Sequence, residues 1–226
     1  MRNVLVIHTT THDPAKSTSW AMGGAVVDEI KRRHPRSTVR LINANDLHIV
    51  QNLSCYSNGK RNCADPASGP YRCWAHFDSV ENPKKYGGVD QMPAIYDGIK
   101  WANTVVFTSS TRWGSHSALA QKVIERMDTL ENRHASYGEP NFFAGKTLGV
   151  VMGGLHWKTG RAATQLGEVF AEMGFTVNLP HGVLAWQRSR NPNFEHPDQD
   201  RPYVLAWLST PEGVQAVSTF VDALEA

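Results

Sequence analysis

Short apolar runs rich in β-branched residues alternate along this chain with longer stretches of helical period. The apolar runs predict strands at residues 3–8, 38–42, 104–108, 146–152 and 175–179. Amphipathic stretches between them predict helices at residues 92–102, 117–130 and 162–173, and two more after residues 17 and 209. Strands that alternate with helices are typical of βαβ units around a parallel sheet.

Five such strands in 226 residues fit a single α/β domain. We predict a flavodoxin-like, doubly wound, five-stranded parallel sheet with strand order 2-1-3-4-5. In a sheet of this order, ligands bind beyond the carboxyl ends of strands 1, 3 and 4. The loops that follow these three strands are therefore the candidates for a functional site.

The regular pattern stops after the second strand, and we expect an irregular insertion over about residues 51–88. It holds all three cysteines of the chain, Cys55, Cys63 and Cys73. This odd, small number, with no apolar run long enough for a signal peptide or a spanning helix, predicts a cytoplasmic protein. With 23 basic against 21 acidic residues the net charge is +2, so neither nucleic acid nor a membrane is an expected partner.

Six hydroxyl side chains lie between the first predicted strand and the helix that follows. Hydroxyls, free backbone N–H groups and a helix dipole together bind phosphate. A hydroxyl that only caps the helix is the alternative, but capping accounts for one of the six. The chain lacks the G-x-G-x-x-G and Walker motifs, which argues against Rossmann-type NAD, ATP and GTP binding. The expected phosphate ligands are Thr9, Thr11, Ser17, Thr18 and Ser19.

The loop after the third strand combines backbone donors with large planar side chains. A flat ring system needs donors at its polar edge and an aromatic or guanidinium group against its body. Alternatively, the tryptophan is a core residue and Ser115 or Ser117 caps the next helix. The residues expected to contact a planar ligand are Ser110, Thr111, Arg112, Trp113 and Gly114.

The loop after the fourth strand begins with Gly153 and Gly154. Paired glycines let the backbone approach a flat ligand closely, although they also suit a plain turn. Histidine side chains in general titrate near neutrality, so His156 is our candidate for protonating a reduced substrate, but most lone histidines in loops are surface residues.

Residues 90–126 resemble the FMN-binding core of the flavodoxin-like NAD(P)H-dependent oxidoreductases. The similarity is carried by M-P-A-I-Y at 92–96, A-N-T-V-V-F at 102–107 and T-R-W-G-S-H-S-A at 111–118. The family includes quinone oxidoreductases, FMN reductases and iron–sulfur flavoproteins. Two features depart from its usual pattern: a serine stands at Ser110 where proline is frequent, and the first loop is longer.

This resemblance implies bound FMN, with NAD(P)H as the co-substrate. Its phosphate would lie in the first loop, and residues 110–114 with 153–156 would surround the isoalloxazine. Hydride would pass from NAD(P)H through FMN to a quinone, a nitro or azo compound, or a free flavin. The resemblance also implies a homodimer or homotetramer that completes the flavin pocket across a subunit interface.

The cysteine segment leaves alternatives open. Cys55, Cys63 and Cys73, with His76, match neither common zinc nor ferredoxin spacings, so we expect no metal, although three cysteines and a histidine suffice chemically for zinc or a cluster. An electron carrier or redox sensor without NAD(P)H activity is the alternative function. Residues 55–61 also fit the C-x5-R loop of tyrosine phosphatases, but no helical pattern follows to activate the cysteine.

Overall fold

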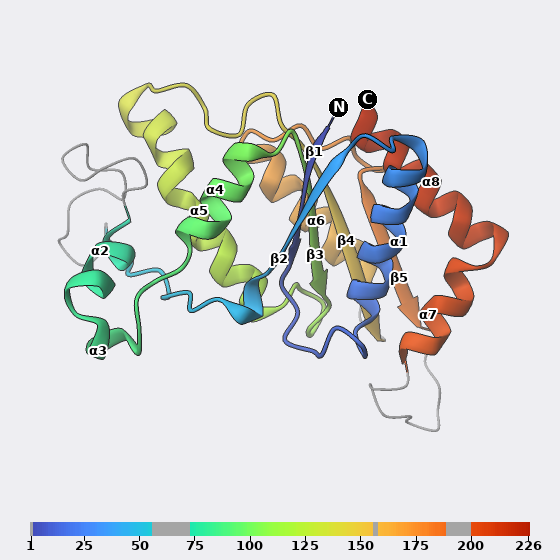
Figure 1. The fold of residues 1–226 in the computed structure, drawn as a ribbon, viewed down its shortest axis with the longest axis horizontal. Helices are drawn as coiled ribbons and strands as arrows, with labels where there is room; N and C mark the ends of the chain where they lie inside the picture. The colour runs from blue at the N-terminus through green and yellow to red at the C-terminus, as the bar shows by residue number, and fades with distance from the viewer. Residues whose placement is uncertain (1, 56–72, 156–157, 189–199) are drawn as a thin grey trace.

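The computed structural model describes residues 2–55, 73–155, 158–188 and 200–226. At its centre lies a parallel five-stranded sheet of order β2-β1-β3-β4-β5, in which all neighbouring strands run in the same direction (Figure 1). The strand bounds are β1 Asn3–His8, β2 Thr38–Asn43, β3 Thr104–Ser110, β4 Thr147–Leu155 and β5 Val183–Arg188. The predicted fold class is confirmed.

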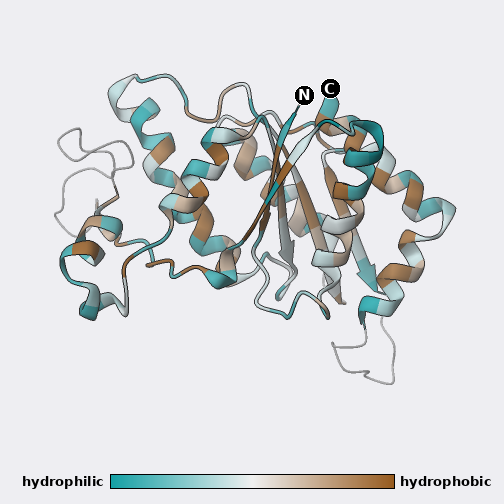
Figure 2. Ribbon diagram, in the orientation of Figure 1, coloured by the Kyte–Doolittle hydropathy of each residue, from teal (hydrophilic) through white to brown (hydrophobic). Residues whose placement is uncertain are grey.

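Helices cover both faces of the sheet (Figure 1). On one face lie α1 Thr18–Arg33, α7 Asp200–Leu208 and α8 Pro211–Glu225; on the other lie α4 Pro93–Trp101, α5 Ala118–Tyr137 and α6 Thr159–Glu172. Side chains of a strand point alternately to the two faces, so Val4 and Val6 pack with α1 and α8 while Leu5 and Ile7 pack with α4 and α5. Figure 2 shows brown, apolar residues along the sheet and teal residues on the outward sides of the helices.

Hydroxyl side chains begin three of the helices. Ser17 accepts a hydrogen bond from the Trp20 N–H at the start of α1, and Ser117 accepts one from Ala120 at the start of α5. Thr210 accepts from Gly213 at the start of α8. Each of these hydroxyls satisfies a backbone donor that has no partner within the helix.

The fifth strand is not where the sequence predicts it. At residues 175–179 the chain makes one parallel bridge, between Thr176 and Thr147, and then leaves the sheet. Pro180 follows and has no N–H to donate to a ladder. Continuous pairing starts at Val183, opposite Val150. The prediction of a strand at 175–179 was therefore wrong, and α7 was not predicted.

Two strands run further than expected toward the site. β3 continues through Ser110 and β4 through Leu155, because Ser110 pairs with Gly153 and Gly154 with Gln187. Residues assigned to loops from the sequence therefore lie on rigid strands.

The described part of the insertion is more regular than predicted. The short 3-10 helix η1 Ala44–Asp46 precedes it, and it contains helices α2 Trp74–Glu81 and α3 Pro83–Tyr86. Both helices lie beyond α4 and α5, away from the sheet (Figure 1). Among the residues that the structure describes, no helix has the length and apolar composition needed to span a membrane.

Candidate functional site

A cavity of about 50 Å³ lies where β1, β3 and β4 end and α1 begins. Three parts of the chain predicted to meet here do meet. Of the residues that the sequence predicts for the site, six line the cavity: Ser17, Thr18, Ser110, Arg112, Gly153 and Gly154. The other lining residues are Thr10, His12, Lys16, Leu155 and Asp200.

Backbone donors of α1 begin at this cavity. In the described part of the chain, the N–H groups of Thr18 and Ser19 have no hydrogen-bond acceptor, whereas the Trp20 N–H bonds to Ser17. Unpaired N–H groups at a helix start carry a partial positive charge. Side chains of Lys16, His12 and Arg112 add basic groups around the same space. This arrangement favours an anion such as a phosphate ester.

Ser110 supplies the clearest sign of a missing partner. Its hydroxyl oxygen is buried in the cavity wall and makes no hydrogen bond to any residue that the structure describes. A buried polar group without a partner costs about 1–3 kcal/mol, so a ligand atom that bonds to it gains that energy. The residue that departs from the family's usual proline therefore brings to the cavity a hydroxyl that a ligand could use.

The other predicted phosphate ligands, Thr9, Thr11 and Ser19, do not line the cavity. The hydroxyl of Thr9 donates to the carbonyl of Thr108 at 2.7 Å, and Thr9 is buried. Ser19 is also buried and shares a 3.0 Å hydrogen bond with the Ser17 hydroxyl. Thr11 is exposed and lies outside the cavity wall. The first loop thus divides its hydroxyls between holding the loop and facing the cavity.

Gly153 and Gly154 are required by the protein's own packing. A Cβ atom at Gly153 would lie 2.4 Å from the Thr18 hydroxyl oxygen. At Gly154 it would lie 2.4 Å from the hydroxyl oxygen of Thr159 and 2.6 Å from that of Thr111. Real Cβ contacts are essentially never this short, so a larger residue displaces part of the cavity wall. The Thr111 hydroxyl donates a hydrogen bond to the Thr159 hydroxyl at 3.1 Å, and both hydroxyls lie next to Gly154.

Trp113 projects from a tight turn at the end of β3. Arg112 and Ser115 exchange two backbone hydrogen bonds, of 2.7 and 3.0 Å, and enclose Trp113 and Gly114. Both enclosed residues have positive φ, 51° for Trp113 and 79° for Gly114, as in type I′ turns. Positive φ is unfavourable for a bulky residue, and 87% of the Trp113 surface is exposed. Trp113 is therefore an outward-facing aromatic residue and not a core residue.

A buried histidine, His8, lies where β1 ends and the first loop begins. His8, the last residue of β1, stacks on Trp20 with ring centroids 3.6 Å apart and bonds through Nδ1 to the Thr108 hydroxyl at 2.5 Å. Burial lowers the pKa of His8 from 6.5 to about 4. His8 is therefore neutral near pH 7 and packs as an uncharged ring.

Asp200 brings a carboxylate to the cavity from an unexpected direction. It is the first residue of α7, it is buried, and it pairs with Arg188 of β5 at 2.7 Å. The Arg188 guanidinium in turn lies 3.6 Å from the centroid of the Tyr203 ring. Pairing with Arg188 offsets the negative charge that would oppose an anion here. No motif in the sequence marks Asp200, because the strand and helix that carry this pair were not predicted.

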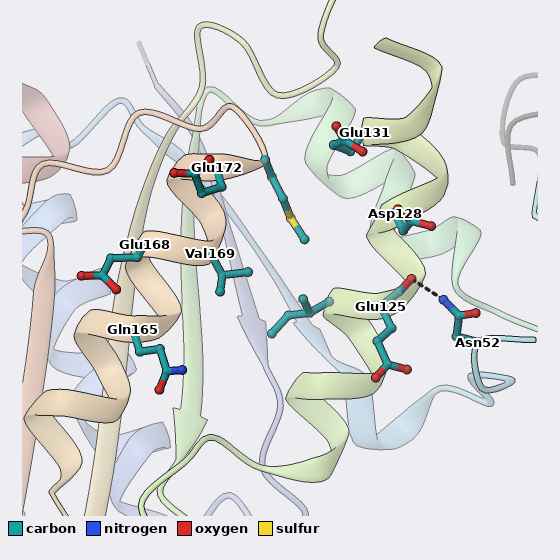
Figure 3. Close-up of a pocket in the computed structure, with 10 residues that line it drawn as sticks. Asn52, Glu125, Asp128, Glu131, Gln165, Glu168, Val169 and Glu172 are labelled. Atoms are coloured by element: carbon teal, nitrogen blue, oxygen red, sulfur yellow. Dashed lines mark hydrogen bonds between the residues drawn. The ribbon is translucent and has the colours of Figure 1, made fainter. Parts of the chain in front are cut away.

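A larger groove, of about 900 Å³, lies between α5 and α6 (Figure 3). Its apolar lining residues are Ile124, Val169 and Met173, and the Asn52 side chain donates a hydrogen bond to the Glu125 carbonyl. The carboxylates around it come from Glu125, Asp128, Glu131, Glu168 and Glu172. Such a rim repels phosphate groups, so the groove is unsuited to FMN or NAD(P)H.

The cysteine segment gives no complete metal site in the described residues. Cys55 and Cys73 are buried, and the His76 ring bonds through Nδ1 to the Asp90 carbonyl at 3.1 Å. No group of three or more His, Cys, Asp or Glu side chains suited to a metal occurs within these described parts. Cys63, the arginine that ends the C-x5-R pattern, and His156 lie outside the described residues.

Solved structures with the same architecture include flavin proteins at low sequence identity. RosB, solved with bound 8-demethyl-8-formylriboflavin-5'-phosphate, is 13% identical, with a TM-score of 0.69 over 99% of this chain and 77% of RosB. The NADH:FMN oxidoreductase EMOB is 14% identical (TM-score 0.55, 100% of this chain, 89% of EMOB). An azoreductase from Bacillus anthracis str. Sterne is 13% identical (TM-score 0.54, 100% of both chains). These likenesses show a shared fold.

A search among curated proteins gives no sequence match. The family model of the NADPH-dependent FMN reductases, however, matches residues 3–190. That range includes all five strands and ten of the eleven residues around the cavity, all except Asp200. It also includes residues 90–126, on which the resemblance rests. This chain belongs to the NADPH-dependent FMN reductase family.

Proposed function

We propose that this protein transfers hydride from NAD(P)H, through bound FMN, to a quinone, a nitro or azo compound, or a free flavin. Membership of the family implies FMN as cofactor and NAD(P)H as co-substrate. The observation that supports the proposed site is the Ser110 hydroxyl, which is buried at the cavity and has no hydrogen-bond partner among the described residues. The first N–H groups of α1, which also lack an acceptor in the described parts of the chain, lie at the same end of the sheet.

The residues around the cavity fit the phosphate end of FMN. The N–H groups of Thr18 and Ser19 and the hydroxyl of Thr18 would bind phosphate oxygens. Lys16 and Arg112 would balance its negative charge. The volume of about 50 Å³ suits one end of the cofactor, so we propose that the flat ring system lies outside this hollow, toward the ends of β3 and β4.

The ends of β3 and β4, which also form part of the wall of the hollow, would offer the contacts that a flat ring needs. Trp113, already exposed at the tip of its turn, would stack on the ring, and Ser110 would donate a hydrogen bond to a polar ring-edge or ribityl atom. Gly153 and Gly154 would present backbone atoms without side chains in the way. When bound, FMN supplies the two-electron chemistry, taking hydride from NAD(P)H and passing electrons to the acceptor.

A quinone that gains two electrons also gains two protons. We propose His156, the residue that follows the last residue of β4 in sequence, as the one that donates one of these protons to the acceptor. The sequence places it directly after Leu155, which is at the cavity. We also propose a homodimer or homotetramer, in which a second subunit covers the open side of the ring.

An anaerobic titration of the purified protein with NADH and NADPH tests the function. We expect flavin absorbance that bleaches with at least one of the two nucleotides. Flavin that binds but responds to neither contradicts the proposal and supports an electron carrier. Added cluster absorbance would support the iron–sulfur alternative for Cys55, Cys63 and Cys73, and a colourless protein that cleaves an aryl phosphate would support the phosphatase reading.

Separate acceptors then identify the substrate class. The protein, reduced with one equivalent of nucleotide, is mixed with a quinone, an azo dye, a nitroaromatic compound or free FMN, and reoxidation is followed in each case. We expect one class to be reduced at least about tenfold faster than the others, a difference of about 1.4 kcal/mol in the barrier. Equal rates with all four would contradict a dedicated acceptor site.

A further inference from the structure

Arg201, the second residue of α7, reaches across to the first loop. Its guanidinium nitrogen Nη1 donates to the backbone carbonyl of Pro14 and, at 3.3 Å, to that of Ser17. These residues are more than 180 positions apart in sequence. In Figure 1, α7 lies beside the end of α1 at which this loop enters the helix. A residue from the end of the chain therefore holds the loop next to the cavity.

The bond to Ser17 has a directional effect on the next residue. The Ser17 carbonyl and the Thr18 N–H belong to one planar trans peptide, so they point in opposite directions. The same carbonyl accepts the Ala21 N–H at 3.3 Å, as the first turn of α1 requires. With the carbonyl held by Arg201 and Ala21, the Thr18 N–H points away from the helix body. Thr18 is at the cavity.

A guanidinium on the carbonyl also strengthens the donor at the other end of the peptide. Hydrogen bonds in a chain polarise one another, and a charged donor polarises more than a neutral one. Arg201 itself is not among the residues at the cavity, whereas its neighbour Asp200 is. Arg201 thus acts on the cavity through backbone groups and not by contact with its contents.

We infer that Arg201 is a positioning residue for the phosphate of FMN: it orients and polarises the Thr18 N–H from behind. This inference rests on the proposed function, because it assumes that the cavity takes the FMN phosphate. It extends the site to a helix outside the range matched by the family model, which ends at residue 190. The effect is specific to the phosphate and leaves contacts to the ring unchanged.

The test compares FMN with riboflavin, which has the same ring and ribityl chain but no phosphate. Bound flavin is first removed, and each flavin is then titrated into the protein while quenching of its fluorescence is followed. The variants are Arg201→Met, which keeps the stem and removes the donors, and Arg201→Lys, which restores donors on one nitrogen. Arg32→Met is the matched control, because Arg32 is an exposed arginine of α1 that bonds to Glu29.

We expect Arg201→Met to weaken FMN binding about tenfold, as expected for the loss of a charged hydrogen bond. Riboflavin binding should change less than about twofold on the same scale. Arg201→Lys should recover most of the FMN affinity, and Arg32→Met should match the wild type for both flavins. The ratio of the two affinities separates phosphate positioning from a general loosening of the fold.

Equal weakening for FMN and riboflavin would overturn the inference, because it would show a structural role. Unchanged FMN binding in Arg201→Met would overturn it as well, while the proposed function would stand. If the wild-type protein binds neither flavin, the proposed function fails and the inference fails with it. Thermal unfolding of each variant checks that the compared proteins are folded.

Discussion

Two hydrogen bonds, of 2.9 and 2.7 Å, join the guanidinium of Arg126 to the carboxylate of Asp90, and both side chains are buried. The same groups hold the segment after β2, since Asp90 accepts the Val50 N–H at 2.9 Å and Arg126 donates to the Val50 carbonyl at 2.5 Å. α5, the segment before α4 and the segment after β2 therefore meet at one ion pair.

Removing one charge of this pair should destabilise the fold strongly. Asp90→Asn leaves the Arg126 charge buried without its counterion, which typically costs about 3–5 kcal/mol. Urea unfolding measures the loss. Glu139→Gln is the control, because Glu139 pairs with Arg133 near the surface, where a pair contributes less than about 1 kcal/mol. Equal losses in the two variants would contradict the assignment of this pair as a buried tie.

Stability should fall in mild acid because of His8. Its pKa is about 4 in the folded protein and 6.5 in the unfolded chain, so the unfolded chain binds more protons between these values. The free energy of unfolding is therefore highest above pH 6.5 and decreases as the pH falls toward 4, by roughly 3 kcal/mol. Chemical unfolding at a series of pH values measures this slope.

His8→Asn tests the origin of that slope. Asparagine offers a hydrogen-bonding atom near the position of Nδ1 but does not titrate, so the variant should be less stable at pH 7 and should lose most of the change between pH 4 and 6.5. His134→Asn, at an exposed histidine of α5, should keep the slope. If both variants keep it, another group is responsible.

Gly153→Ala should damage the site, whereas Gly24→Ala should not. The new methyl group at 153 meets the Thr18 hydroxyl at 2.4 Å and the Ser19 nitrogen at 3.3 Å. We expect a loss of about 1–3 kcal/mol in stability from overpacking and weaker FMN binding. At Gly24, on α1 itself, a Cβ meets nothing within 4 Å, so alanine should stabilise the helix by about 0.5–1 kcal/mol. Unfolding curves of the two variants measure the change in stability, and FMN titrations measure the change in affinity.

Trp113→Asn should weaken both flavins alike. Asparagine tolerates the positive φ of the turn, so the free energy of unfolding should be unchanged or slightly higher. Loss of the stacked ring should reduce affinity for FMN and riboflavin about three- to tenfold. Fluorescence titration measures both. This pattern differs from that expected of Arg201→Met, and a loss confined to FMN would place Trp113 at the phosphate instead.

The sequence predicted the sheet because strand runs such as 3–8 and 104–108 are short, apolar and β-branched. It misplaced the last strand because Phe175 is buried and apolar at the sheet edge without being part of a ladder. It missed α7 because Val204 is the only fully buried apolar residue among its described side chains, which leaves no stripe of helical period.

The three loops of the site were also predictable, but the direction of each hydroxyl was not. Thr9, Thr10 and Thr11 are identical in composition and adjacent in sequence. In the structure Thr9 bonds to the strand beside it, Thr10 is at the cavity and Thr11 faces outward. Rotamer and backbone direction decide these differences, and both depend on β3, which is a hundred residues away. Asp200 and Arg201 could not be recognised from the sequence either, because their partners, Arg188 and the first loop, are also distant from them in the chain.

The close contact between Gly153 and Thr18 limits which residues can occupy the two positions together. Both side chains would occupy the same space, so the size tolerated at one position depends on the residue at the other. A relative of this protein that carries alanine at 153 should carry glycine or alanine at 18, because either one lacks the hydroxyl oxygen that the new methyl group would meet. Paired substitution, and not independent drift, is the expected history of these two sites.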